Sequence, residues 1–72
     1  MEDLFKVLVT FSNGHQHVDT DWTSDMEVIK SSLIRLIRGP GRLFIKEVLV
    51  VDSCDCTVFL HRDGKQVWPA VA

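Results

Sequence analysis

Three histidines have the clearest capacity for chemistry in this sequence. His15 and His17 alternate along an expected strand, so both imidazoles lie on one face of it. We expect His61, near the end of a later strand, to lie at the same edge of the sheet. Neutral imidazoles are common ligands of zinc and other divalent ions. One hypothesis is therefore a metal site of His15, His17 and His61; the alternative is exposed histidines beside a turn, with no partner.

Arg35, Arg38 and Arg42 form a basic group near the end of the expected helix. Such a cluster can hold phosphate groups, which gives a second hypothesis, a nucleic-acid-binding module. Compensation of the helix dipole explains at least the two helical arginines without any ligand. No aromatic residue interleaves with them, as stacking on a single strand requires. The net charge of −2 also differs from the basic excess of a general nucleic-acid binder.

The other reactive residues do not form a catalytic set. Cys54 and Cys56 are separated by one residue at an expected turn, which suits neither a structural disulfide nor a redox motif that opens a helix. We interpret them as one turn cysteine and one core cysteine in a reduced, cytoplasmic protein. No serine or cysteine has a base nearby, and no glycine-rich loop opens a helix. We predict that the chain is not an enzyme and needs no cofactor.

Length and composition favour one small folded domain, residues 1–72. The sequence is 46% hydrophobic and 25% charged, which is ordinary for a globular protein. At 72 residues, one hydrophobic core is only just sufficient for stability. No apolar run approaches the roughly 20 residues that a membrane-spanning helix needs, so we predict no membrane association.

The segment Ser24–Arg38 is the one helix that the sequence predicts. Ser24 and Glu27 have the spacing of a capping box. The apolar residues that follow recur at helical spacing and form one stripe. They are Met26, Ile29, Leu33, Leu36 and Ile37. Gly39-Pro40-Gly41 should end the helix, because proline cannot continue its hydrogen bonding.

Two strands are expected before the helix, joined by a tight turn at Asn13-Gly14. With those two residues as the whole loop, Val9 faces Val18 and Phe5 faces Trp22. This register predicts one apolar face and one mainly polar face. The apolar face would hold Phe5, Val7, Val9, Phe11, Val18 and Trp22.

The sequence after the helix predicts two further strands and a short last one. They cover residues 42–51, 56–62 and 65–68, with turns at residues 52–55 and at Asp63-Gly64. The predicted fold is therefore α+β. An antiparallel sheet of four or five strands carries one helix across one face, in the order β-β-α-β-β with a possible further β.

Apolar residues lie on both faces of this second half, and one helix covers only one face. We predict that the other face is a protein interface, most simply that of a homodimer. Its residues would be Phe44, Val48, Val50, Phe59 and Trp68. Alternatively, strand twist and residues 69–72 cover part of this face. The expected function is a small interaction module that binds another protein in an accessory, inhibitory or regulatory role. A host modulator encoded by a phage would fit that description.

Overall fold

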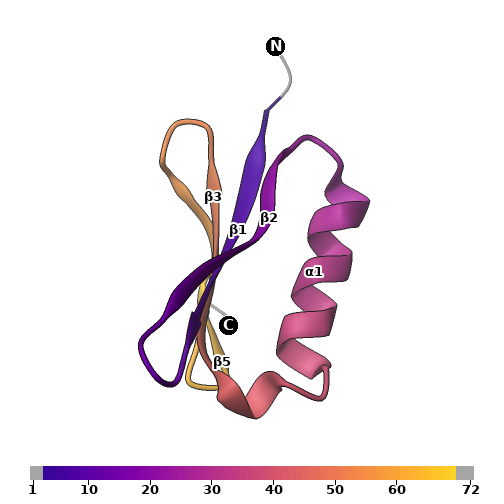
Figure 1. Ribbon diagram of the computed structural model, residues 1–72. Coiled ribbons are helices and arrows are strands. Elements are labelled where there is room, and N and C mark those ends of the chain that lie inside the picture. Colours follow the sequence, from indigo (N-terminus) through magenta and orange to yellow (C-terminus); the bar gives the residue numbers. More distant parts are fainter. Residues whose placement is uncertain (1–2, 70–72) are drawn as a thin grey trace.

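A five-stranded antiparallel sheet carries one helix on one of its faces (Figure 1). The computed structural model describes residues 3–69. The elements are β1 (Phe5–Phe11), β2 (Gln16–Thr23), α1 (Met26–Arg38), the short 3-10 helix η1 (Arg42–Phe44), β3 (Ile45–Asp52), β4 (Thr57–Arg62) and β5 (Lys65–Trp68). Their order across the sheet is β2-β1-β3-β4-β5. The predicted α+β architecture is confirmed, and it includes the fifth strand.

The helix begins one residue later than the capping-box pattern predicts. The backbone N–H of Glu27 donates to the carboxylate of Asp25 at 3.0 Å, so Asp25 is the N-cap. Asp25 in turn donates its own N–H to the Thr23 hydroxyl at 3.1 Å. The predicted cap at Ser24 is therefore wrong, because the chain is still extended through Asp25. At the other end the Gly39 N–H bonds to the Arg35 carbonyl at 2.9 Å, and the helix stops there as predicted.

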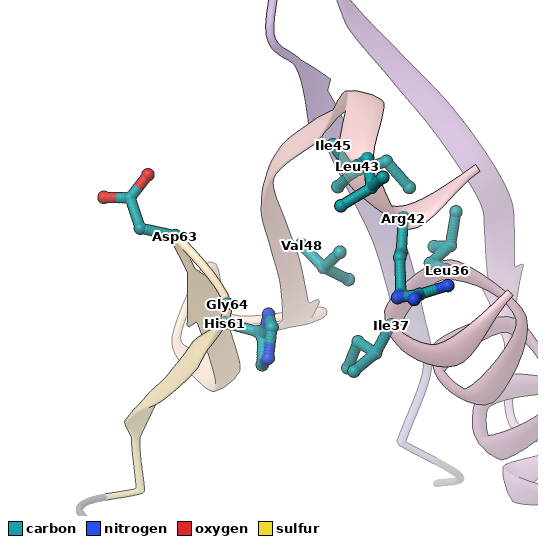
Figure 2. A pocket seen from close by; sticks show the side chains of 9 residues that line it. All are labelled: Leu36, Ile37, Arg42, Leu43, Ile45, Val48, His61, Asp63 and Gly64. Atoms are coloured by element: carbon teal, nitrogen blue, oxygen red, sulfur yellow. The ribbon is translucent and has the colours of Figure 1, made fainter. Parts of the chain in front are cut away.

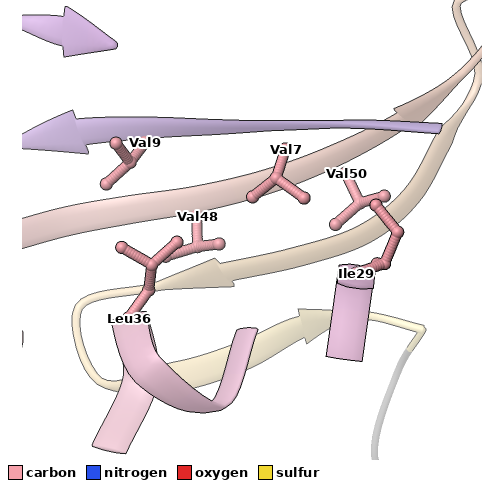
Figure 3. Packing of buried hydrophobic residues seen from close by; sticks show 6 residues of the cluster. All are labelled: Val7, Val9, Ile29, Leu36, Val48 and Val50. Atoms are coloured by element: carbon pink, nitrogen blue, oxygen red, sulfur yellow. The ribbon is translucent and has the colours of Figure 1, made fainter. Parts of the chain in front are cut away.

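The core lies between α1 and the neighbouring strands β1 and β3 (Figure 3). Its buried residues are Val7 and Val9 of β1, Val48 and Val50 of β3, and Ile29 and Leu36 of α1. Leu33 and Ile37 pack partly buried beside them, which confirms most of the predicted stripe. Met26, in contrast, is exposed at the first turn. The helical period thus located the buried side of α1 correctly.

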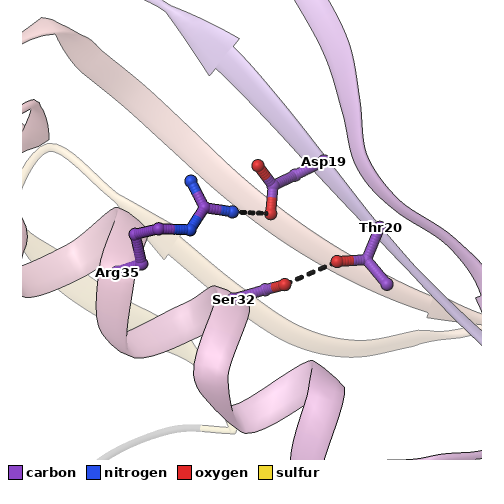
Figure 4. A network of polar contacts seen from close by, with 4 residues as sticks. All are labelled: Asp19, Thr20, Ser32 and Arg35. Atoms are coloured by element: carbon purple, nitrogen blue, oxygen red, sulfur yellow. Dashed lines mark hydrogen bonds and ion pairs between the residues drawn. The ribbon is translucent and has the colours of Figure 1, made fainter.

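Polar contacts fix the helix against the edge strand β2 (Figure 4). The hydroxyls of Thr20 and Ser32 share a hydrogen bond of 2.5 Å, with Ser32 buried in the middle of the helix. Arg35 pairs with Asp19, whose side chain is only 10% exposed. A buried hydroxyl needs a partner, so this pair constrains how α1 sits on the sheet.

The first hairpin has a three-residue loop instead of the predicted two-residue one. Gly14 donates to the Phe11 carbonyl at 2.9 Å, and Phe11 donates to that of His15 at 2.8 Å. Gly14 has φ +90°, while Asn13 keeps a negative φ. A turn followed by one left-handed glycine is the standard three-residue hairpin loop.

This longer loop changes which residues pair across the hairpin. Val9 pairs with His17 and Leu8 pairs with Val18, whereas the two-residue loop predicted Val9 opposite Val18. Two further irregularities, one on each side of Val7, put Phe5 opposite Thr23 instead of Trp22. The predicted register is wrong, and the slip moves Val18 to the face away from the helix.

Of the two later turns, the β3–β4 turn has three loop residues and the β4–β5 turn has two. The β3–β4 loop repeats the three-residue pattern: Asp55 has φ +62°, and the Asp52 carboxylate accepts from two loop amides at 2.9 Å. Cys54 and Cys56 are both exposed thiols, so the prediction of a core cysteine at Cys56 is wrong. Asp63 and Gly64 both have positive φ, which confirms the predicted two-residue turn.

Candidate functional site

The face predicted to be an interface is, in its central part, the face that α1 covers. Val48 and Val50 are 1% and 2% exposed and belong to the core. Phe59 pairs with Val50 and so lies on the same, helix-covered side. The assignment of these three residues to an outer interface is therefore wrong. The run Val48–Val51 is apolar at every position, so alternation alone does not identify the buried side.

The other two predicted interface residues are exposed, but in different places. Phe44 lies in η1, because β3 begins at Ile45 and not at Arg42. It is therefore not part of the sheet surface. Trp68 pairs with Leu60 on β4 and is 53% exposed. Trp68 alone of the predicted set lies on the sheet face away from the helix, which is called the open face below.

An unbroken line of apolar side chains crosses the open face. Each member is the direct cross-strand partner of the next, from one sheet edge to the other. The line, called the apolar row, is Val18, Leu8, Leu49, Leu60 and Trp68. Direct cross-strand neighbours have Cβ atoms about 5 Å apart, so the five side chains form one continuous surface.

Charged and polar side chains border the apolar row on one side, and Lys6 with the apolar residues Val51 and Trp22 borders it on the other. On one side, Arg62 forms two hydrogen bonds with Glu47, at 2.7 and 3.0 Å. Thr10 pairs with Glu47, and Lys65 pairs with Arg62, so this border also crosses several strands. On the other side, Lys6 lies 5.3 Å from the ring centroid of Trp22. An apolar centre with a polar rim is the usual composition of a protein interface.

The structure does not bring the three histidines together. His17 and His61 occupy the two ends of one cross-strand line, His17–Val9–Val48–His61. Three strand spacings of about 4.8 Å separate them by about 14 Å, too far to share an ion. Among residues 3–69, no three histidine, cysteine or acidic residues are grouped to hold a metal. The predicted metal site is therefore wrong, because β1 and β3 lie between its strands.

The predicted arginine cluster is divided by the helix. Arg35 reaches the edge strand β2 through its ion pair with Asp19. Arg42, from η1, lies on the other side of α1, where it lines a pocket with residues of β3 and β4. Arg38 is exposed in the last helical turn. The three side chains thus do not form one basic surface, and nucleic-acid binding stays a prediction that this arrangement does not favour.

A pocket of about 430 Å³ lies beside the C-terminal end of α1 (Figure 2). Its lining comes from four separate segments: the helix end, η1 with the start of β3, the centre of β3, and the end of β4 with the β4–β5 turn. The residues are Leu36, Ile37, Arg42, Leu43, Ile45, Val48, His61, Asp63 and Gly64. Sequence reasoning missed this pocket. The one local signal for it is the break at Gly39-Pro40-Gly41, directly before Arg42 and Leu43.

Neither a membrane-spanning helix nor a similarity to known proteins indicates a role for these surfaces of residues 3–69. Within residues 3–69, no helix has both the length and the hydropathy that crossing a membrane requires. Comparisons with protein-family models, curated proteins and solved structures gave no match for this chain.

Proposed function

We propose that this chain is a small, non-enzymatic protein-interaction module that pairs with a second copy of itself through the open face. The observation that carries the proposal is the apolar row, which crosses all five strands. The helix α1 does not cover this face, since it packs on the opposite side of the sheet. The suggested cover by residues 69–72 falls almost entirely outside the described part of the chain.

Exposure of the apolar row supports an interface role. Val18 and Trp68, at its two ends, are 40% and 53% exposed. Leu8, Leu49 and Leu60 are partly exposed between them. Packing this contiguous apolar surface against another sheet removes it from water, which favours association.

The apolar row is suited to packing against its own copy. In the proposed dimer, the open faces of two copies stack on each other. A twofold axis parallel to β3, midway between the two sheets, relates the copies, so the strands of the partner run across the interface in the reverse order. Leu49 then faces Leu49, Leu8 faces Leu60, and Val18 faces Trp68. The smallest member of the row meets the largest, so the two surfaces interdigitate at the usual sheet spacing of about 10 Å.

The polar border fits the same arrangement. Arg62 and Lys65 of one copy lie over the border positions of β1 and β2 in the other, which are Thr10 and Gln16. No cation is placed opposite another cation. The two copies of Glu47 meet at the axis, each already bonded to Arg62 of its own chain. Like charges in direct opposition are the usual electrostatic obstacle to self-association, and here the one such pair is compensated.

The dimer leaves the helix side of each copy free for a different protein. Val28 and Ile34 are exposed apolar residues on the outer surface of α1. An accessory, inhibitory or regulatory role in the cytoplasm fits a small module with two such helical surfaces, one from each copy. We propose that these helical surfaces bind a protein other than this chain.

Sedimentation velocity over a range of protein concentrations tests the dimer. The unmodified chain should approach twice its mass of 8.2 kDa at high micromolar concentration. Leu49→Lys, at the centre of the apolar row, should sediment as a monomer. The matched control is Ile34→Lys, an equally drastic change on the outer surface of α1, which should leave the dimer intact. An unmodified chain that stays monomeric, or a Leu49→Lys variant that stays dimeric, would show that the open face is not the dimer interface.

A further inference from the structure

We infer that the pocket at the end of α1 binds a small amphipathic carboxylate, with its apolar chain inside and its carboxylate at Arg42. This site is separate from the proposed dimer. The pocket lies on the helix side of the sheet, whereas the apolar row lies on the open face. Either site can therefore be present without the other.

The floor and walls of the pocket are apolar. Leu36 and Ile37 contribute from the helix, and Ile45 and Val48 contribute from the sheet. Leu43 stands at the rim and is 80% exposed, so an apolar ligand would cover a side chain that now faces water. A volume of about 430 Å³ lies in the range of small-molecule sites, about 300–1,000 Å³.

Arg42 supplies a positive charge that no carboxylate of residues 3–69 neutralises. Arg35 and Arg62 each pair with an acidic side chain, whereas Arg42 has only a 3.4 Å hydrogen bond to the Gly39 carbonyl. A guanidinium carries five N–H donors, so donors remain for a ligand. Figure 2 shows the Arg42 guanidinium beside Leu36, at the pocket, and the nearby acidic side chain, Asp63, directed away from it.

His61 adds a second polar group on the sheet side of the pocket. It pairs with Val48, which fixes the imidazole on the face covered by the helix. Its ring stacks on Phe59 with centroids 6.5 Å apart and planes 8° from parallel. In Figure 2 the imidazole lies across from Ile37 and Arg42. An arginine and an imidazole over an apolar floor form a site for a ligand with one anionic end.

The charge at Arg42 distinguishes a carboxylate from a neutral ligand of the same shape. Octanoate and octanol share an apolar chain, but only octanoate has the negative charge. A charge-assisted hydrogen bond contributes about 1.5–3 kcal/mol, so its loss should weaken octanoate binding about tenfold or more. Octanol has no charged group, so its binding depends mainly on the apolar walls and should change little when this charge is removed.

The experiment is a titration of the ¹⁵N-labelled full chain with octanoate and with octanol, followed by amide chemical shifts. Octanoate should shift the amides of Ile37, Arg42 and His61. Arg42→Gln should weaken octanoate at least about tenfold and leave octanol unchanged within about twofold. Arg38→Gln is the control, because it removes an exposed arginine four residues away, and it should alter neither titration. The spectrum of each variant without ligand verifies that it is folded.

Three results would overturn the inference. The first is the absence of shifts around the pocket at saturating octanoate. The second is an equal loss of octanoate and octanol binding in Arg42→Gln, which would indicate an apolar cavity without charge recognition. The third is an equal effect of Arg38→Gln, which would indicate general attraction to a basic surface. None of these results depends on whether the protein is a dimer.

Discussion

Two adjacent residues of β3, Val48 and Leu49, provide the sharpest test of which sheet face is the core. Val48 is 1% exposed and lies under α1, whereas Leu49 lies in the apolar row on the open face. Replacing each with alanine removes apolar atoms from opposite sides of the same strand. The two losses of stability should therefore differ in size and in their dependence on protein concentration.

Val48→Ala should lower the free energy of unfolding by about 2–3 kcal/mol. Two buried carbons account for about 1.6 kcal/mol, and the cavity that they leave adds to it. A chain of 72 residues has a total stability of about 4–11 kcal/mol, so this is a large fraction. The melting temperature should fall by about 10–20 °C, equally at all protein concentrations.

Leu49→Ala should behave differently although it removes more atoms. In the monomer Leu49 is partly exposed, so the loss at low micromolar concentration should be about 1 kcal/mol. At high concentration the loss should increase, because the unmodified chain gains stability from association and the variant does not. Thermal unfolding followed by circular dichroism at both concentrations measures this.

The reasoning fails if Leu49→Ala costs more than Val48→Ala at low concentration. That result would place the hydrophobic core on the other side of the sheet. Equal effects of Leu49→Ala at both concentrations would leave the core assignment intact and contradict only the proposed dimer.

Three further predictions concern the two ends of α1 and the first hairpin, and urea unfolding measures all of them. Asp25→Ala should lower the free energy of unfolding by about 1 kcal/mol, because it removes the acceptor of a first-turn amide. Ser24→Ala should change it very little. A larger loss for Ser24→Ala than for Asp25→Ala would support the capping box at Ser24 instead. Gly14→Ala should lower the free energy of unfolding by about 1–2 kcal/mol, because the φ of Gly14 is +90°. Gly39→Ala should lower it by about 1–3 kcal/mol, because a Cβ at this position would lie 2.1 Å from the backbone oxygen of Arg35. Gly41→Ala is the control for both, with no atom within 4 Å, and an equal loss in it would contradict these explanations.

Local patterns in the sequence were enough to predict the α-helix, the strands and their order, but not η1, whose residues were expected in a strand. The stripe containing Ile29 and Leu36 located the buried side of α1, because a helix repeats about every 3.6 residues. Asp63-Gly64 predicted its turn correctly, because both residues tolerate positive φ. These features depend on residues close together in the chain.

The register of the first hairpin was not predictable from the same kind of pattern. Asn13-Gly14 suits a two-residue loop, but it also suits a three-residue loop in which Gly14 alone is left-handed. The two loops differ by one residue, and one residue exchanges the faces of a strand. Val18 was therefore predicted in the core and lies instead in the apolar row.

The candidate sites needed information that the chain does not carry locally. The apolar run of β3 offers Val48 to one face and Leu49 to the other, and only the packing of α1 selects between them. The pocket joins Ile37, Arg42 and His61, which the fold brings together from separate elements. Neither arrangement follows from residue spacing.

The helix does not lie over the middle of the sheet. Its main contacts are with β1, β2 and β3, and β5 lies at the far, uncovered end of the sheet. All four residues of β5 are exposed, and its partner β4 has no fully buried residue. Local opening of a protein begins where few apolar contacts hold the backbone. We expect local opening of this fold to begin at β5, the sheet edge farthest from α1, which carries Trp68 of the apolar row. In β4, Val58 and Phe59 still pack against the core.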